Sequence, residues 1–203
     1  MARRTKEEAQ ATRSHILDTA ERVFEERGVS GTSLHEIAKA AGLTRGAIYW
    51  HFKDKADLFN AMMERATMPL EEAGGVRDFG GADKTLAQMR ASFRDVFKRI
   101  AGDPQMRRVF EIATHKVEYV AETHAVRERH VRVRNECLAD LERALRSAMR
   151  RGELARRMPA RAAAIGLHAL LDGLIRNWML DPTGFDLVKV GPRALDAYLA
   201  GLA

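Results

Sequence analysis

The sequence predicts an all-α protein of about nine helices, and three observations support this fold class. Charged residues make up 31% of the chain and aromatic residues only 6%, and the composition is rich in Arg, Glu and Ala, which favour helices. Runs of β-branched residues are scarce, and no stretch alternates polar and apolar residues over the length of a strand. Apolar residues instead recur at helical spacing, and Gly or Pro separates one such segment from the next.

Side chains that can cap a helix precede four apolar segments in the N-terminal third. These capping residues are Thr5, Ser33, Thr44 and Asp54. The first two are each followed three residues later by Glu, which is the pattern of a capping box. We therefore predict a first helix ending at Gly28, short helices over 34–41 and 45–52, and a fourth helix that begins at Lys55.

A glycine-bearing stretch, 74–81, predicts a linker to a second region of long helices. The helices expected there are separated by Gly- and Pro-containing breaks and cover 83–101, 104–112, 115–150, 160–180 and 187–200. The predicted domains are therefore an N-terminal helix-turn-helix domain over 10–70 and a C-terminal helical domain over 83–203.

Two short helices joined by a turn have the lengths and spacing of a helix-turn-helix motif, at about residues 33–52. Gly42 in the turn can take the positive φ that lets the second helix cross the first. Arg45 and Tyr49 are four residues apart and share the outward face of that second helix. An Arg at this place can donate two hydrogen bonds to guanine O6 and N7, and Gly46 lets the backbone approach the groove closely.

Polar side chains around the motif suit contacts with DNA phosphates, and these are Thr32, Thr44, His51 and Lys55. The alternative is an ordinary helical corner in which Arg45 and Lys55 are solvated charges. DNA binding is favoured because Tyr49 and Trp50, beside Arg45, are large aromatic residues predicted to be exposed.

Composition and charge restrict the cell compartment and the partners. The net charge of +6 favours a polyanionic partner. Cys137 is the single cysteine, which excludes an intrachain disulfide and favours the reducing cytosol. The charged N-terminus has no apolar core of a secretory signal, and the most apolar stretch, 160–180, carries four charged or His residues. We expect a cytoplasmic protein without a membrane partner.

Enzyme signatures are missing from the sequence. It contains no Gly-x-Ser-x-Gly elbow, Walker loop or dinucleotide fingerprint. A metal site could be drawn from Glu118 and His115, His124 and His130, but the histidine spacings of nine and six do not stack on one helical face. We therefore predict no catalytic residue, cofactor or metal site.

The residues around the motif resemble a known family. The segments Thr32–Leu43 and Thr44–Lys55 are similar to the DNA-binding signature of the TetR/AcrR family, and the first ten residues resemble the start of repressors of RND-type multidrug efflux operons. Shorter fragments persist later, such as Asp172–Trp178. The resemblance implies about nine helices, of which three form the DNA reader, the fourth links the domains and the last two form a dimer.

The resemblance also implies roles for individual positions. Arg45 and Tyr49 would meet bases or adjoining phosphates, with Gly46 against the groove. Further side chains would hold the DNA backbone, namely Thr32, Ser33, Thr44, His51 and Lys55. Arg3 and Arg4 resemble an arm that reaches a minor groove, although a disordered basic start is an equal alternative.

A repressor of this kind needs a largely apolar cavity for its inducer. Candidate wall residues are Phe93, Val96, Phe97, Phe110, Cys137, Leu141 and Leu167, and ordinary core packing is the alternative for each. His168, Asp172 and Arg176 step by four along one helix. They form either an internal Asp172–Arg176 ion pair with a nearby histidine, or anchors for a ligand, and the resemblance favours the edge of a pocket.

The dimer interface is predicted on the last two helices. Gly166 and Gly173, one heptad apart, would allow close approach of another helix, together with four apolar residues, Leu195, Tyr198, Leu199 and Leu202. Two-fold symmetry would require a roughly palindromic operator. The basic run Arg127, Arg129, Arg132 and Arg134 is interpreted as a solvated face rather than a second nucleic-acid site.

The function predicted from these observations is that of a ligand-responsive repressor. It would bind double-stranded operator DNA as a homodimer, control a multidrug efflux operon and leave the DNA when a small amphipathic molecule binds. One alternative is a TetR-family repressor of a metabolic operon that senses a metabolite. Another is a sequence-tolerant architectural DNA binder.

Overall fold

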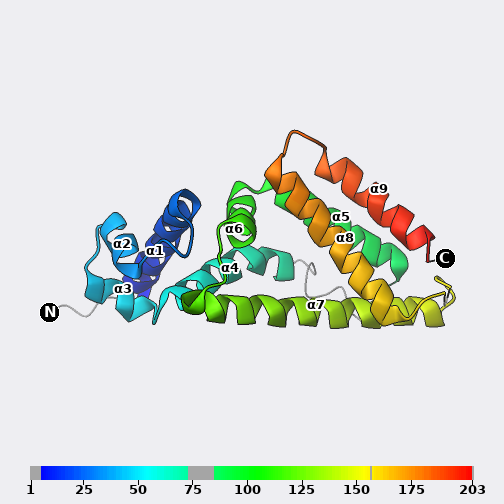
Figure 1. The fold of residues 1–203 in the computed structure, drawn as a ribbon, viewed down its shortest axis with the longest axis horizontal. Helices are drawn as coiled ribbons and strands as arrows, with labels where there is room; N and C mark the ends of the chain where they lie inside the picture. The colour runs from blue at the N-terminus through cyan, green and yellow to red at the C-terminus, as the bar shows by residue number, and fades with distance from the viewer. Residues whose placement is uncertain (1–5, 73–84, 156, 203) are drawn as a thin grey trace. The chain divides into compact units, whose positions relative to one another are not determined.

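A computed structural model describes residues 6–72, 85–155 and 157–202, and the elements within them are helices (Figure 1). Their order is α1 (Lys6–Arg27), α2 (Leu34–Ala40), α3 (Arg45–His51), α4 (Lys55–Glu72), α5 (Leu86–Gly102), α6 (Pro104–His115), a 3-10 turn (Ala121–Thr123), α7 (His124–Arg150), α8 (Ala160–Leu180) and α9 (Leu187–Ala200). The all-α prediction is confirmed. The predicted cap at Thr5, the linker 74–81 and the arm residues Arg3 and Arg4 lie outside the described residues.

The helix predicted over 115–150 is shorter than expected, because α7 begins only at His124. In the segment before α7, residues 116–123, backbone polar groups bond with a nearby side chain and with the turn that follows α1. The Val120 N–H donates to the Thr123 hydroxyl at 3.0 Å, and that hydroxyl donates to the Glu118 carbonyl. The Lys116 carbonyl accepts from Val29 N–H at 2.9 Å. Such bonds compete with helical ones, so the chain bends here.

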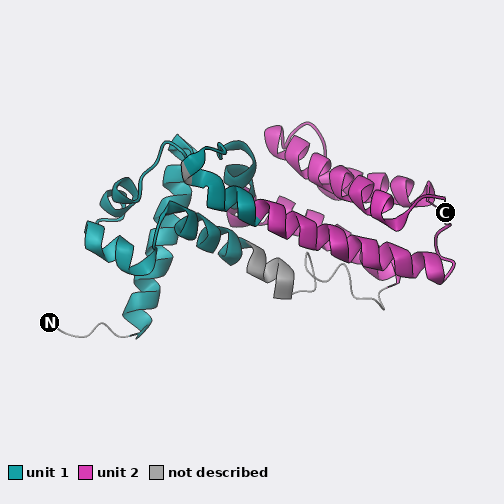
Figure 2. Ribbon diagram, turned by 60° about the horizontal axis from the view of Figure 1, so that its bottom comes forward, with its two compact units in different colours: residues 1–66, 108–129 teal, residues 67–107, 130–203 magenta. Residues whose placement is uncertain are grey.

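The chain divides into two compact units (Figure 2). Unit 1 comprises residues 1–66 and 108–129, and unit 2 comprises 67–107 and 130–203. The segment 108–129, which the sequence placed in a C-terminal domain, thus groups with the N-terminal helices. Helices α4, α6 and α7 each contribute residues to both units.

The core of unit 1 is built from the apolar faces of its helices. Ile16 and Phe24 of α1, Ile37 of α2 and Ile48 of α3 are fully buried. The segment 108–129 adds three further buried residues, Val109, Ile112 and Val126. Burying a side chain of this size is worth about 1.5–3 kcal/mol relative to exposure. The short α2 and α3 are therefore held in place by packing.

Close helix packing in unit 2 depends on two glycines. A Cβ at Gly191 of α9 would lie 2.7 Å from the Phe97 ring of α5. A Cβ at Gly166 of α8 would collide with the Tyr198 hydroxyl of α9, which donates to the Ala163 carbonyl at 2.9 Å. Helix α9 thus packs on both α5 and α8 within the same chain.

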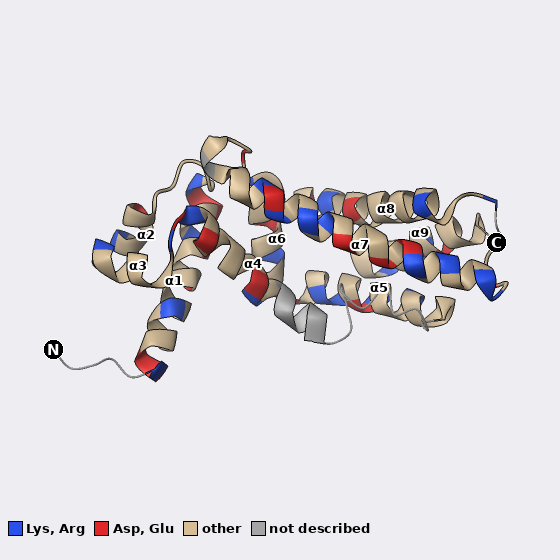
Figure 3. Cartoon of the chain, turned by 90° about the horizontal axis from the view of Figure 1, so that it is seen from below, with Lys and Arg blue, Asp and Glu red and all other residues tan. Residues whose placement is uncertain are grey.

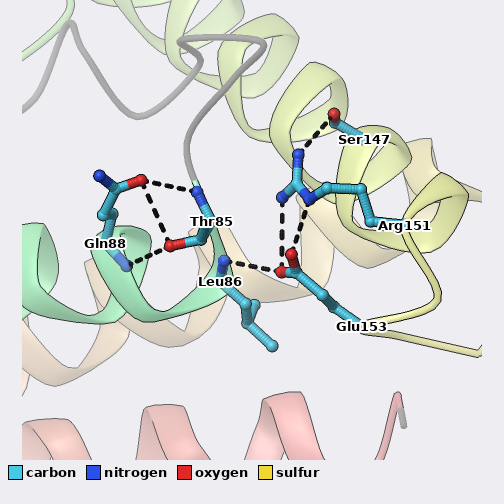
Figure 4. A network of polar contacts seen from close by, with 6 residues as sticks. All are labelled: Thr85, Leu86, Gln88, Ser147, Arg151 and Glu153. Atoms are coloured by element: carbon cyan, nitrogen blue, oxygen red, sulfur yellow. Dashed lines mark hydrogen bonds and ion pairs between the residues drawn. The ribbon is translucent and has the colours of Figure 1, made fainter.

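A polar network joins the start of α5 to the end of α7 (Figure 4). The Glu153 carboxylate accepts from the Leu86 backbone N–H at 2.8 Å and pairs with Arg151 at 2.6 Å. Arg151 also donates to the Ser147 hydroxyl at 2.9 Å. These bonds hold the pKa of Glu153 below its ordinary value, chiefly through Arg151. Among the described helices, none is long and apolar enough to cross a membrane.

Candidate nucleic-acid interface

Helix α2 and the turn after it form as their sequence predicts. Ser33 accepts from the Glu36 N–H at 3.2 Å, and the Glu36 carboxylate accepts from the Ser33 N–H at 2.8 Å, which completes the capping box. These bonds from Ser33 hold the pKa of Glu36 below its ordinary value. Gly42 takes a φ of +67°, and Leu43 N–H donates back to the Ala38 carbonyl at 2.9 Å. The turn therefore ends α2 with a left-handed glycine.

Helix α3 presents its polar and aromatic side chains outward. Thr44 caps it by accepting from Ala47 N–H at 3.2 Å. Ile48 is fully buried, whereas Tyr49 is 47% exposed and Trp50 71% exposed. The Arg45 guanidinium carbon lies 5.5 Å from the centroid of the Tyr49 ring. The two residues thus form one cationic and aromatic patch on the outer face.

The backbone beside this patch is open. A Cβ placed on Gly46 would meet nothing nearer than the Thr44 hydroxyl at 4.0 Å. The His51 ring is half-buried and lies edge-on to the Trp50 ring at a centroid distance of 4.5 Å. The exposed indole is therefore oriented by a neighbour that packs closer to the core.

A hollow of about 410 Å³ adjoins α3 and the helix starts of α2 and α4. It is lined by Ser30, Gly31, Thr32, Ser33, Leu34, Glu36, Tyr49, Lys53, Asp54 and Lys55. Lys55 Nζ donates to the Ser30 carbonyl at 3.1 Å, so this lysine fixes the turn before α2 as well as carrying charge. Lys53 is exposed and was not among the residues predicted from the sequence, although its position beside the capping Asp54 was a usable signal.

The structure argues against one predicted phosphate contact, that of the Thr32 side chain. Thr32 is only 2% exposed, and its hydroxyl donates to the Gly28 carbonyl at 2.8 Å. Its side chain fixes the turn that follows α1, so the Thr32 hydroxyl proton is not available to a phosphate. Ser33, Thr44 and Lys55 do reach the surface of unit 1 in full or in part.

The predicted inducer residues fall into both units. Phe93, Val96, Leu141 and Leu167 are buried in unit 2, and Phe110 is half-buried in unit 1. Cys137 is also partly buried, and burial raises the pKa of its thiol to about 11. The apolar candidates of unit 2 therefore occupy core positions, which was the alternative stated for each.

A polar cluster in unit 2 links α7 and α8. Arg176 Nε donates to the Asp172 carboxylate at 2.7 Å, which confirms the ion pair that the spacing allowed. Burial lowers the pKa of His168 and that of His130, and the positive charges of Arg134 and Arg176 lower both further. Sequence spacing found the α8 members of this cluster but missed the α7 residues that face them.

Two family models of known proteins match this chain. The family model for bacterial regulatory proteins of the tetR family matches residues 16–62, and the model for the C-terminal region of MAATS-type transcriptional repressors matches residues 84–203. The chain belongs to the TetR family. As a member of this family it is a ligand-responsive, DNA-binding transcriptional repressor.

Individual TetR-family proteins resemble the chain over almost all of its length. The HTH-type transcriptional regulator TtgR of Pseudomonas putida is 39% identical, with 93% of this chain and 90% of TtgR covered. The crystal structure of NalD, the secondary repressor of the MexAB-OprM multidrug efflux pump in Pseudomonas aeruginosa, gives a TM-score of 0.88 at 33% identity and 98% coverage of both chains. A SmeT–triclosan complex gives 0.82 at 34% identity, covering 94% and 91%.

The predicted dimer residues of the TetR-type C-terminal region need correction. Leu195, Leu199 and Leu202 are buried inside the single chain and have almost no surface left for a second subunit. Gly166 and Tyr198 contact each other within the chain. Gly173, where a Cβ would meet nothing within 4 Å, is open to a partner, and Gly166 and Tyr198 each keep a partly exposed surface. The predicted close helix approach exists, but it joins α8 to α9 of one subunit.

The arginine run of α7 lies among charges of both signs. Arg127, Arg132 and Arg134 are exposed, and basic and acidic residues are interspersed along the helix (Figure 3). A continuous basic stripe would favour a polyanion, whereas mixed charges are typical of a solvated helix face. The structure is consistent with that interpretation.

Proposed function

We propose that this TetR-family protein represses a multidrug efflux operon as a homodimer and leaves its operator when an amphipathic small molecule binds. The observation that carries the DNA-binding part is the exposed pairing of Arg45 with Tyr49 on α3. The efflux assignment is supported by relatives such as NalD, which represses an efflux pump. The inferred role is regulatory and not enzymatic, in the cytoplasm.

The two sides of the α3 surface suit the two kinds of DNA contact. Arg45 offers a planar fork of N–H donors that matches guanine O6 and N7 in the major groove. Gly46 leaves the groove wall free to approach the backbone. The hollow beside α3 carries Lys53, Lys55 and the backbone N–H groups at the start of α4, which attract a phosphate. Base contacts would specify the site, and phosphate contacts would fix the register.

A second subunit would bind the outward faces of α8 and α9. Apolar residues remain exposed there in the single chain, including Ile165 of α8 and Val190 of α9. Ala169 of α8 and Ala197 of α9 are exposed small residues in the same helices. Such a face suits a partner subunit. In a two-fold symmetric pair, the two copies of α3, the recognition helices, would meet the two halves of a palindrome.

The inducer would bind in unit 2, near the α7–α8 polar cluster formed by His130, Arg134, His168, Asp172 and Arg176. The SmeT–triclosan complex supports a small amphipathic aromatic molecule as the class to test first. His168, Asp172 and Arg176 are partly buried on α8, where Leu167 is fully buried, and polar groups next to apolar ones provide the mixed environment that amphipathic ligands require. The inducer must bind the released state more tightly than the DNA-bound state.

Fluorescence anisotropy with the DNA upstream of the protein's own gene tests this proposal. We expect a palindromic site to be preferred over random duplex by at least about a thousandfold. Arg45→Ala should weaken specific binding by about 1–3 kcal/mol and relax discrimination at one base pair in each half-site. Arg143→Ala, which removes a surface arginine paired with Asp140 within α7, is the matched control.

The outcomes separate the rival functions. Equal affinity for all duplexes would indicate an architectural DNA binder, and an equal loss on specific and random DNA would reject Arg45 as a base reader. Addition of triclosan, and then of a panel of amphipathic drugs, should release the site. Release by metabolites alone would instead indicate control of a metabolic operon.

A further inference from the structure

Three acidic residues of α1 share one face of that helix. Asp18, Glu21 and Glu25 follow one another at steps of three and four residues, so they form an acidic stripe. Two arginines from other helices pair with this acidic stripe. Arg65 of α4 contacts Asp18 at 2.8 Å and also pairs with Glu21, and Arg108 of α6 contacts Glu25 at 3.1 Å.

The Arg65 contact is anchored in the interior of unit 1. Glu21 is only 2% exposed, although it carries a carboxylate. Arg65 reaches it from α4 and also donates to the Ser14 carbonyl at 3.4 Å. One guanidinium therefore holds three residues spread over two turns of α1. A buried ion pair adds little stability compared with apolar packing, but separating its charges is strongly unfavourable, so a shift of α4 along α1 that parts Arg65 from Glu21 is opposed.

The helices that carry Arg65 and Arg108 differ from α1 in how they are divided between the two units. Helices α4 and α6 have residues in both units, whereas α1 belongs to unit 1 alone. Helix α1 packs directly on α2, and α2 packs on α3. At the acidic stripe, α4 and α6, which continue into unit 2, therefore hold α1. Helix α1 in turn supports α3, the recognition helix, through α2.

We propose that Arg65 and Arg108 are positioning residues, which fasten α1 to α4 and α6 and thereby set the spacing of the two recognition helices on the operator. This inference rests on the proposed function, because it requires a dimer on a palindrome. If the pairs only stabilised unit 1, their removal would lower the melting temperature and leave the spacing requirement unchanged.

The variants are chosen so that the protein still folds. Arg65→Met alone would leave the Glu21 carboxylate buried without its cation, which is strongly destabilising. The double substitution Glu21→Met with Arg65→Met removes both charges at similar volume, and Arg108→Met removes the half-exposed pair. The matched control is Arg143→Met, whose pair with Asp140 lies within α7. Circular dichroism verifies helix content and the melting temperature of each variant.

The probe is a palindromic duplex that the wild-type protein selects from a random library, with a second duplex carrying one extra base pair at its centre. The extra pair changes both the separation and the rotation of the half-sites, so we expect wild-type affinity to fall by about tenfold or more. The triple variant, with Glu21→Met, Arg65→Met and Arg108→Met, should lose no more than about threefold, because its recognition helices adjust to the new spacing. The Arg143→Met control should retain the wild-type ratio.

Each result decides between the possibilities. A folded triple variant that keeps the full wild-type spacing penalty overturns the proposal, even if it melts at a lower temperature. If the triple variant does not fold, Arg108→Met alone must still reduce the penalty, and an unchanged penalty rejects the role of α6. A wild-type protein that selects no palindrome would overturn the proposed function and this inference together. Failure of the variants alone would leave the proposed function standing.

Discussion

The guanidinium of Arg45 lies over the ring of Tyr49, 5.5 Å from its centroid, on the exposed face of α3. A cation held over an aromatic face is attracted by the ring quadrupole, and at an exposed site this is worth about 0.5–1 kcal/mol. The ring therefore restricts the directions in which Arg45 can point before DNA arrives. An arginine oriented in advance loses less conformational entropy on binding.

The first prediction separates the ring of Tyr49 from its hydroxyl. Tyr49→Phe keeps the aromatic face and should retain specific DNA affinity within about twofold, whereas Tyr49→Ala should lose about 2–5-fold through Arg45 alone. Anisotropy titrations on the specific duplex measure both variants. An equal loss in the two variants would show that the hydroxyl carries the effect and that the ring does not orient Arg45.

The second prediction concerns the close contact of α9 with α5. A Cβ added at Gly191 would lie 2.7 Å from the Phe97 ring, which is fully buried. Gly191→Ala should therefore lower the free energy of unfolding by about 1–3 kcal/mol, the usual cost of overpacking. Gly102→Ala, at the end of α5 where a Cβ meets nothing within 4 Å, is the control. Urea denaturation should show it unchanged or slightly stabilised, and equal losses would reject the packing argument.

The features that the sequence predicted correctly depend on local rules. Helix periodicity, the capping residues Ser33 and Thr44, and the left-handed turn at Gly42 each involve residues within one or two turns of each other. The exposure of Arg45 and Tyr49 follows from the same periodicity, because Ile48 fixes which face is buried. The exposed face of α3 was therefore largely predictable from the residues alone.

The features that the sequence missed depend on contacts between distant segments. Apolar residues occur on the exposed face of α9, such as Val190 and Ala197, as well as on its buried face, so periodicity could not show that Leu195 and Leu199 pack inside the chain. In the sequence, Arg65 and Arg108 have the pattern of ordinary surface charges, because their acidic partners on α1 are distant along the chain. The sequence predicted that Thr32 contacts a phosphate, but it could not show that the Thr32 hydroxyl donates to the Gly28 carbonyl.

The third prediction uses the acid sensitivity of the network between α5 and α7. The Arg151 hydrogen bond and the Leu86 N–H hold the pKa of Glu153 below its ordinary value of 4.5. The folded protein therefore gains stability from the ionised carboxylate above about pH 4.5, and loses it as the pH falls through the lowered pKa. Glu153→Gln should melt at a lower temperature than wild type at pH 7, and the gap should close toward pH 3. A gap that is constant with pH would show that the charge of Glu153 is not involved.

The fourth prediction concerns the reactivity of Cys137. Burial raises the pKa of its thiol to about 11, and the nearby Asp140 carboxylate acts in the same direction. Since the thiolate is the reactive form, its fraction at pH 7.5 is about a hundredfold below that of an ordinary exposed cysteine. Alkylation by iodoacetamide should therefore be at least about a hundredfold slower in the folded protein than in urea. A rate equal to that of the unfolded chain would mean that α7 opens readily around Cys137. A rate that keeps rising about tenfold per pH unit and levels off only near pH 11 would establish the raised pKa as the cause.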